Sequence, residues 1–341
     1  MRPEPTRRLV LGAAATAGML GLAGCKGLEV LGPLPRPGQA VRTLEHAIAA
    51  EELMLARYQA AQGALSGGHA SRVVAAIAVQ HQAHLDQLRA RLDLPQRLRT
   101  ARPRPSPSVP PPAGGRHAIL AGLAQAEAQA SARLTAELAA EPAALAQLMA
   151  CIGAAEAAHQ VLLGHGRTMS SPAGTGSAGT GSASTGSAST GPAAVVRGAR
   201  GQASRALPAL QAALAAEQAA SYGYGIAGAH LTGAKYAAAA ADCVAHQSAR
   251  DTLSAMISAL GGQPRPAAIA YRLPGPYGTA REAASLAAAL ERQAAETYVG
   301  LVAVPAPGLR TFAADGISSC AVRAARWTGR SPAFPGLPPA R

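Results

Sequence analysis

The same pattern of four helical segments occurs twice in the chain, and this repeat limits what the chain can fold into. We expect helices at about 41–65, 70–92, 117–140, 142–163, 207–229, 235–260, 280–302 and 310–328. In each half, a stretch rich in proline separates the first two segments from the last two, and it can form neither a helix nor a central strand. The repeat therefore predicts two copies of one four-helix unit.

Short stretches of the two halves align residue by residue. Residues 44–51 (LEHAIAAE) match residues 210–217 (LQAALAAE), and the segment that begins at His81 matches the one that begins at His246. Hydrophobic residues make up 49% of the chain and aromatic residues only 3%, so the core must be built from Ala, Leu and Val. Alanine-rich periodic segments with few β-branched residues favour helix. We predict an all-α protein.

The first 25 residues have the features of an export signal. Arg2, Arg7 and Arg8 form a basic region, and residues 9–22 form an apolar run that is too short to span a membrane. The sequence LAGC that ends at Cys25 resembles the lipobox of bacterial lipoproteins. This resemblance implies cleavage before Cys25, lipidation of its thiol and anchoring on the extracytoplasmic face of the cell membrane.

Residues 6–11 (TRRLVL) also resemble a twin-arginine motif, which would imply export after folding. Adjacent arginines are common in ordinary export signals too, so both export routes stay open. The predicted organisation is a signal peptide at 1–24, a tether at 25–40, a first bundle at 41–163, a Gly/Ser/Thr/Ala linker at 164–204, a second bundle at 205–329 and an extended tail at 330–341.

Many arginines lie in predicted linkers and on helix faces, so solvation by itself explains most of the net charge of +13, although a basic chain can also have an acidic partner. For a lipid-anchored protein, we expect that partner to be an anionic envelope surface. Nucleic acid is the other usual partner of a basic protein, but the export signal and the lack of basic stretches with interleaved aromatic residues argue against it. The sequence identifies no protein partner.

The fourth segment carries Glu156 and His159, which are three residues apart and therefore lie on one helix face. The other segments of this half carry Glu51, His81 with His84, and Glu127 at nearly the same level, because the paired residues are almost equidistant from the turns that join their helices. Carboxylates and imidazoles are suitable ligands for Fe, Mn or Zn. These six residues are the candidate metal ligands.

This order of hairpin, long crossover and hairpin resembles the four-helix bundles of the ferritin-like superfamily. The resemblance implies that Glu51 and Glu127 are the single glutamates of helices one and three, and that Glu156 with His159 is the Glu-x-x-His motif of helix four. The second helix departs from the family pattern, because His81 stands where the family has glutamate. The missing carboxylate favours one metal ion or an asymmetric pair over a symmetric di-iron centre.

The second half retains only part of this set. Its corresponding residues are Glu217, His246, Glu291, Arg323 and Arg326. The two arginines would repel a cation and could pair with the two glutamates, so we expect this half to be free of metal. The Arg-x-x-Arg motif and the proline-rich tail resemble a ferritin-like domain of unknown function found in actinobacterial lipoproteins.

The cysteines and tyrosines leave alternatives open. Lipidation of Cys25 would leave three cysteines in an oxidising compartment, where Cys243 and Cys320 could form a disulfide or remain buried free thiols. Tyr58 and Tyr224 each follow a candidate glutamate by seven residues. Either tyrosine could be a redox-active neighbour of a metal or a core residue.

Two functions therefore remain. The first bundle could bind a transition metal and perform oxidase-like or metal-handling chemistry, or both bundles could be non-enzymatic binding or scaffold modules of the envelope. We find no nucleophile–histidine–acid arrangement and no glycine-rich phosphate loop, so hydrolase and nucleotide-binding functions have no support. The sequence does not decide whether the chain is an enzyme.

Overall fold

The computed structural model describes residues 38–92, 107–168 and 191–337, without the side chains of 165–168. These residues form helices and their connections, with no strand among them, which confirms the predicted all-α fold. The predicted signal peptide, Cys25 and residues 169–190 of the linker lie outside the described residues. None of the described helices is long and apolar enough to cross a membrane.

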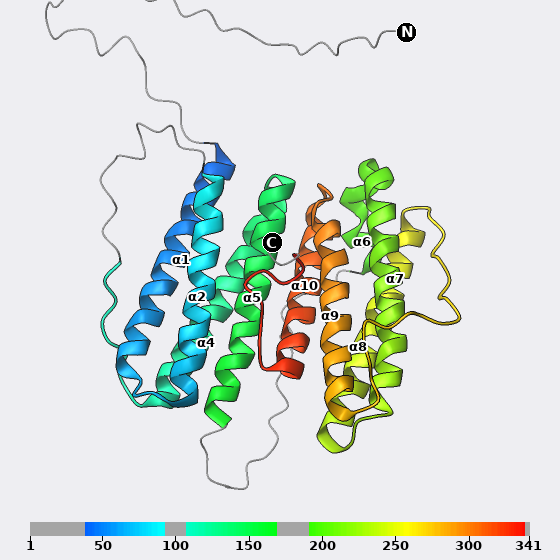
Figure 1. Cartoon of the computed structure of the whole chain (residues 1–341). Helices are drawn as coiled ribbons and strands as arrows, with labels where there is room; N and C mark the ends of the chain where they lie inside the picture. The colour runs from blue at the N-terminus through cyan, green and yellow to red at the C-terminus, as the bar shows by residue number, and fades with distance from the viewer. Residues whose placement is uncertain (1–37, 93–106, 169–190, 338–341) are drawn as a thin grey trace, which may run out of the picture. The chain divides into compact units, whose positions relative to one another are not determined.

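All eight predicted helices are present (Figure 1). Those of the first half are α1 (Gln39–Ala64), α2 (Gly68–Arg91), α4 (Arg116–Glu137) and α5 (Ala143–Thr168). Those of the second half are α7 (Ala203–Gly228), α8 (Gly233–Ala259), α9 (Ala280–Val302) and α10 (Pro307–Thr328). Two short helical pieces, Pro192–Val195 (α6) and Arg197–Gln202, lie within the stretch predicted as linker.

Local sequence signals explain several of the helix boundaries. Gly67 and Gly68 have φ angles of 70° and 83°, which side chains disfavour, and they form the tight turn between α1 and α2. Thr279 and Glu282 form a capping box at the start of α9. Gly329, with φ of 66°, ends α10, and this left-handed residue lets the chain turn away from the helix axis.

The helices of each half pack against one another, and α5 of the first half packs along α10 of the second (Figure 1). One cluster of buried apolar side chains includes residues of both halves, such as Ile152 of α5 and Ile317 of α10. Arg310 of α10 is buried, and its guanidinium donates hydrogen bonds to the backbone oxygens of Ala139 and Glu141 in the first half. The two halves therefore pack against each other through a shared apolar core and buried hydrogen bonds. The sequence does not decide whether they pack together.

The segment after α10 turns back over the first half. We call residues 330–337 the tail. The backbone oxygen of Ser331 accepts a hydrogen bond from Gln80, and that of Ala333 lies 2.7 Å from Nε2 of His84. Phe334 packs against the apolar core, and a backbone hydrogen bond from Leu337 to Phe334 closes a turn. The tail is therefore folded onto α2, where the sequence predicted only an extended segment.

Candidate metal centre

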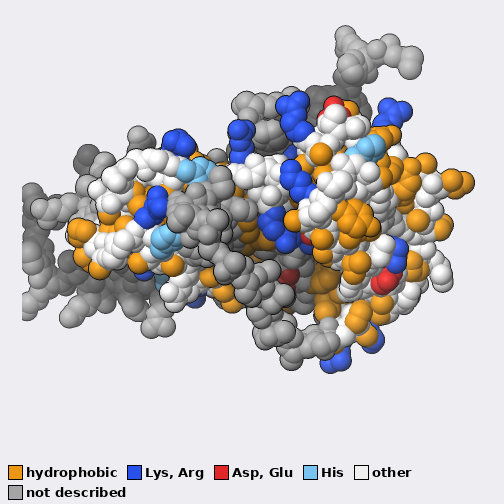
Figure 2. Space-filling model, turned by 90° about the horizontal axis from the view of Figure 1, so that it is seen from below, with side chains coloured by type: hydrophobic (Ala, Val, Ile, Leu, Met, Phe, Trp, Pro, Cys, Tyr) orange, Lys and Arg blue, Asp and Glu red, His pale blue; other side chains and the backbone are white. Residues whose placement is uncertain are grey.

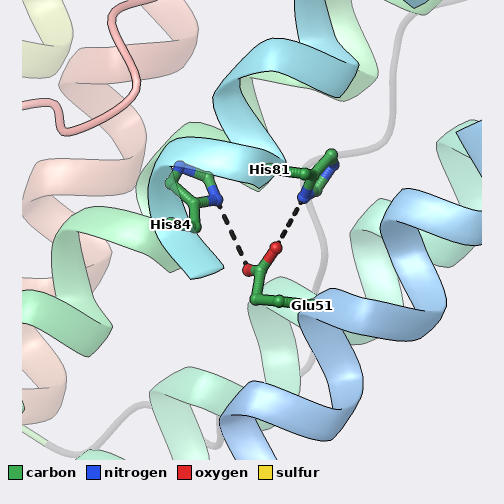
Figure 3. A group of neighbouring side chains, drawn as sticks. All are labelled: Glu51, His81 and His84. Atoms are coloured by element: carbon green, nitrogen blue, oxygen red, sulfur yellow. Dashed lines mark hydrogen bonds and ion pairs between the residues drawn. The ribbon is translucent and has the colours of Figure 1, made fainter. Parts of the chain in front are cut away.

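The structure brings together the six candidate ligands of the first half. Each of them is at most 3% exposed, and they come from all four helices of this half: Glu51 from α1, His81 and His84 from α2, Glu127 from α4, and Glu156 and His159 from α5. Figure 3 shows Glu51 of α1 facing the two histidines of α2. The sequence pattern thus corresponds to one polar cluster inside an apolar helix bundle.

His81 lies between two carboxylates. Its Nδ1 is 2.8 Å from Oε2 of Glu51, and its Nε2 is 2.9 Å from Oε1 of Glu127. Burial opposes the charged form of this imidazole, but the charge of Glu127 and the hydrogen bonds that His81 donates to both carboxylates outweigh it and raise the pKa of His81 well above its ordinary value. Without a metal ion, His81 is therefore an imidazolium that donates to both glutamates.

His84 faces Glu51 with one nitrogen and the tail with the other. Its Nε2 is 2.7 Å from the backbone oxygen of Ala333, which can only accept, so this nitrogen carries a hydrogen. Its Nδ1 lies 3.4 Å from Oε1 of Glu51 and makes no hydrogen bond with any of the described residues. In a neutral imidazole this inner nitrogen has a lone pair directed at the carboxylate.

His159 has the same arrangement. Gln80 donates from Nε2 to the backbone oxygen of Ser331, so its Oε1 faces His159 and accepts a hydrogen bond from Nε2 of that ring at 3.0 Å. The inner Nδ1 of His159 lies 3.2 Å from Oε1 of Glu127. Burial lowers the pKa of His159, which disfavours a second proton on this ring. Its inner lone pair also faces a carboxylate.

Two triplets of ligand atoms are close enough to hold a metal ion. They are Glu51, His81 and His84, and His81, Glu127 and His159, and in each triplet the atoms lie within 4.8 Å of one another. Both triplets contain His81, so a metal ion bound by this residue would replace one of its two protons. The described side chains therefore offer one shared site or two adjacent sites.

Glu156 lies in the same interior but in neither triplet. Burial is the main reason that the pKa of Glu156 is raised well above its ordinary value, and the charges of Glu51 and Glu127 add to the effect. Its Oε2 has no hydrogen-bond partner among the described residues. Tyr58 donates to Oε1 of Glu127, and burial together with the charge of Glu127 raises its pKa, so Tyr58 is a neutral donor.

The second half also has a histidine that bridges two glutamates. Nδ1 of His246 is 2.6 Å from Glu217, its Nε2 is 3.0 Å from Glu291, and Tyr224 donates to Glu291 at 2.6 Å. Arg323 also donates to Glu291, at 2.8 Å, as the sequence predicted.

The prediction for the second arginine is wrong. Arg326 pairs with Asp242 at 3.1 Å, not with a glutamate, because Tyr298 donates to Glu217 at 2.7 Å and occupies that carboxylate together with His246. Sequence reasoning missed Asp242 and Tyr298. Asp242 lies four residues before His246 on α8, and this spacing on one helix face was the available signal.

Of the two alternatives left open for Cys243 and Cys320, the structure has free thiols and no disulfide between them. Cys151, Cys243 and Cys320 are free among the described residues. Cys320 is buried and accepts a hydrogen bond from Arg323, whereas Cys243 donates to the backbone oxygen of Ser221. The helix pairing thus gives each thiol a different neighbour, and burial raises the pKa of both Cys320 and Cys243, which makes the thiols unreactive.

The family comparison matches the second half of the chain. Residues 209–339 match a family described as a domain of unknown function, DUF4439. A crystal structure of a conserved hypothetical protein, rv2844, from Mycobacterium tuberculosis is 34% identical, covers 37% of this chain and 96% of that chain, and has a TM-score of 0.36. The comparison with curated proteins gives no match.

Proposed function

We propose that this chain, whose residues 209–339 match the DUF4439 family, binds a transition metal in its first half. One observation carries the proposal. The inner nitrogens of His84 and His159 face carboxylate oxygens at 3.4 and 3.2 Å, while the outer nitrogen of each ring donates to an oxygen that can only accept. A lone pair that faces a carboxylate is repelled unless a proton or a metal ion lies between them. Burial lowers the pKa of His159 and disfavours the proton there, and a metal ion would take its place.

The second half supports this reasoning as an internal control. There, the guanidinium of Arg323 lies beside Glu291 and provides a positive charge in addition to that of the bridging His246. At the corresponding place the first half has Glu156, a further carboxyl group, and no arginine contacts Glu127 within the described residues. A bound cation would supply the charge that Arg323 supplies in the second half.

The donor set suits Fe, Mn or Zn, because it mixes carboxylate oxygens and imidazole nitrogens. Iron or manganese at this place would give oxidase-like or metal-handling chemistry. The order of hairpin, crossover and hairpin supports placing both halves in the ferritin-like superfamily. The two triplets, which share His81, support one metal ion or an asymmetric pair.

We place the protein on the extracytoplasmic face of the cell membrane, anchored by a lipid on Cys25. This part of the proposal relies on the lipobox-like sequence LAGC and the basic, apolar segment before it. Lys and Arg side chains occur at many points of the face seen in Figure 2, with few Asp or Glu beside them. Such a surface favours contact with anionic lipid.

The alternative function is a non-enzymatic binding or scaffold module of the envelope. The observation in its favour is that the second half buries the same bridge of Glu217, His246 and Glu291 with arginine in place of a metal ligand. On this hypothesis, both clusters would be polar cores that set the register of the helices.

Metal content is the measurement that separates the two functions. The protein from residue 26 onward is purified without chelator and compared with the Glu156→Ala/His159→Ala variant. We expect about one or two equivalents of Fe, Mn or Zn in the parent and their loss in the variant. The matched control is Arg323→Ala/Arg326→Ala, the corresponding pair of the second half, which should retain the metal. A folded but metal-free parent protein would contradict the proposal.

A further inference from the structure

We propose that the tail, residues 330–337 of the second half, positions two ligands of the metal centre in the first half. It would do so by fixing which nitrogen of His84 and of His159 carries hydrogen. This inference rests on the proposed function for its consequence, but its structural content is independent of any metal. On this inference, residues of both halves form the metal centre.

The contact with His84 is direct. The backbone oxygen of Ala333 accepts from Nε2 of His84 at 2.7 Å. In the neutral ring this places the lone pair on the inner Nδ1, which is directed at Glu51. The ring of Phe334 lies edge-on to the same imidazole, with ring centroids 5.3 Å apart. The tail thus sets both the tautomer and the plane of this ring.

The contact with His159 passes through Gln80. Because the backbone oxygen of Ser331 can only accept, the amide nitrogen of Gln80 must face it, at 3.0 Å. The amide oxygen of Gln80 must then face His159, where it accepts from Nε2 at 3.0 Å. The inner Nδ1 of His159 is therefore directed at Glu127. Two backbone oxygens of one short segment orient both histidines.

This arrangement is what a metal centre requires of its surroundings. Metal-binding histidines almost always donate their other ring N–H to a carbonyl or carboxylate oxygen, and loss of such a partner typically weakens metal affinity about 10- to 100-fold. The tail supplies one of these partners itself and orients the other. A tail that served only to cover apolar surface would need Phe334 but not the two carbonyl contacts.

The test compares two changes that remove these contacts with two that do not. Since backbone oxygens cannot be removed by substitution, the first change is a chain that ends at Arg330, and its control ends at Leu337. The second change is Gln80→Leu, which removes the acceptor of His159 without shortening the chain. Its control is Gln82→Leu on the same helix, where Gln82 is exposed and bonded only to Asp86 among the described residues.

Two readouts are taken on the protein from residue 26. Nitrogen chemical shifts of ¹⁵N-labelled histidine give the tautomers of the metal-free protein, and titration with Co²⁺, followed by its visible absorption, gives the affinity. We expect Nε2–H tautomers for His84 and His159 in the parent. The chain ending at Arg330 should lose both fixed tautomers, and Gln80→Leu should lose that of His159. Each should bind Co²⁺ about 10- to 100-fold more weakly, while both controls match the parent.

Fixed tautomers and parental affinity in both altered proteins would overturn the inference while leaving the metal site in place. If the shortened chain does not fold, Gln80→Leu against Gln82→Leu decides the matter. A parent that binds no Co²⁺ would instead contradict the proposed function, and the tautomers of the metal-free protein would still decide the role of the tail.

Discussion

Glu156 and Arg323 stand at corresponding positions of α5 and α10. This difference is one of several between two clusters that share a histidine between two glutamates. Arg323 donates to Glu291 and completes a network with His246. Glu156 brings a third carboxyl group next to Glu51 and Glu127, and its Oε2 has no hydrogen-bond partner among the described side chains. On the proposed function, the residue at this position distinguishes a bundle that takes a metal ion from one that holds its own cation.

An exchange of this residue tests the idea. We expect Glu156→Arg to fold, because its guanidinium can pair with Glu127 as Arg323 pairs with Glu291, and to lower metal content at least about tenfold. Metal analysis and thermal unfolding measure the two effects. Parental metal content in a folded Glu156→Arg protein would show that the charge at this position is irrelevant to binding.

The bridge of the second half gives a prediction on pH. Burial opposes the charged form of His246, but the hydrogen bonds that it donates to Glu217 and Glu291 raise its pKa to about 9. Burial also opposes the charged form of Glu291, but the hydrogen bond from His246 and the charge of Arg323 lower the pKa of Glu291 to about 2. The stabilisation from His246 is fully present below its ordinary pKa of 6.5 and is lost as the pH rises through about 9. That from Glu291 is present above 4.5 and is lost as the pH falls through about 2.

The free energy of unfolding should therefore decrease between about pH 6.5 and pH 9 in the parent, and His246→Gln should remove part of this decrease. Denaturant unfolding of both proteins across this range measures the difference. Since the first half is identical in the two proteins, its own titration cancels in the comparison. Parallel pH profiles would contradict the assignment of the charge to His246.

At the scale of the elements, few of the described helices have a side-chain cap. Their stability therefore comes mainly from the burial of their apolar faces. Among the described helices, the capping box of Thr279 and Glu282 at α9 is the only one. It matters because α9 carries Glu291 and Tyr298 into the second cluster. The start of α9 thus sets the register of two buried polar side chains.

Removal of this cap should have a measurable cost. We expect Thr279→Ala to destabilise the protein by about 1 kcal/mol in denaturant unfolding, since a backbone N–H of the first turn loses its acceptor. Ser285→Ala, on the exposed side of the same helix, should change stability by less than about 0.5 kcal/mol. Equal effects of the two substitutions would indicate that the cap contributes nothing specific.

At the scale of the whole molecule, the two halves from Gly38 onward form one compact unit. Arg310 joins them by donating to two backbone oxygens of the first half, those of Ala139 and Glu141, while it also donates to those of Val302 and Val304 in its own half. Gln147 of α5 adds a hydrogen bond to the backbone oxygen of Val299 on α9. Such contacts, together with the tail, make each half a part of the environment of the other.

Loss of the Arg310 contacts should weaken this interface. We expect Arg310→Met to lower the free energy of unfolding by about 3 kcal/mol, because buried carbonyl groups lose charged donors. Arg292→Met, at an exposed position of α9, is the control and should have little effect. Unchanged unfolding of Arg310→Met would show that the two halves are held together by their apolar surfaces alone.

The sequence by itself determined the helical character, the duplication and the membership of the buried polar cluster. Helices follow from local periodicity and from glycine and proline at their ends, so they can be read without knowledge of the packing. Glu51, His81 and Glu127 could be identified because they stand at level positions on apolar helices, and their counterparts repeat in the second half. The lipid anchor and the export route stay predictions, since Cys25 lies outside the described residues.

Only the tertiary structure decided which groups meet across long separations in the sequence. It paired Arg326 with Asp242, kept Cys243 and Cys320 apart, and packed the tail onto α2. The spacing of Asp242 and His246 places them on one helix face but does not name the partner of Asp242, and the other two contacts leave no periodic signal. Each contact depends on how whole helices rotate and on which carbonyl groups remain free after the cores have packed. The histidine tautomers depend on two such carbonyl groups in the tail, at Ser331 and Ala333.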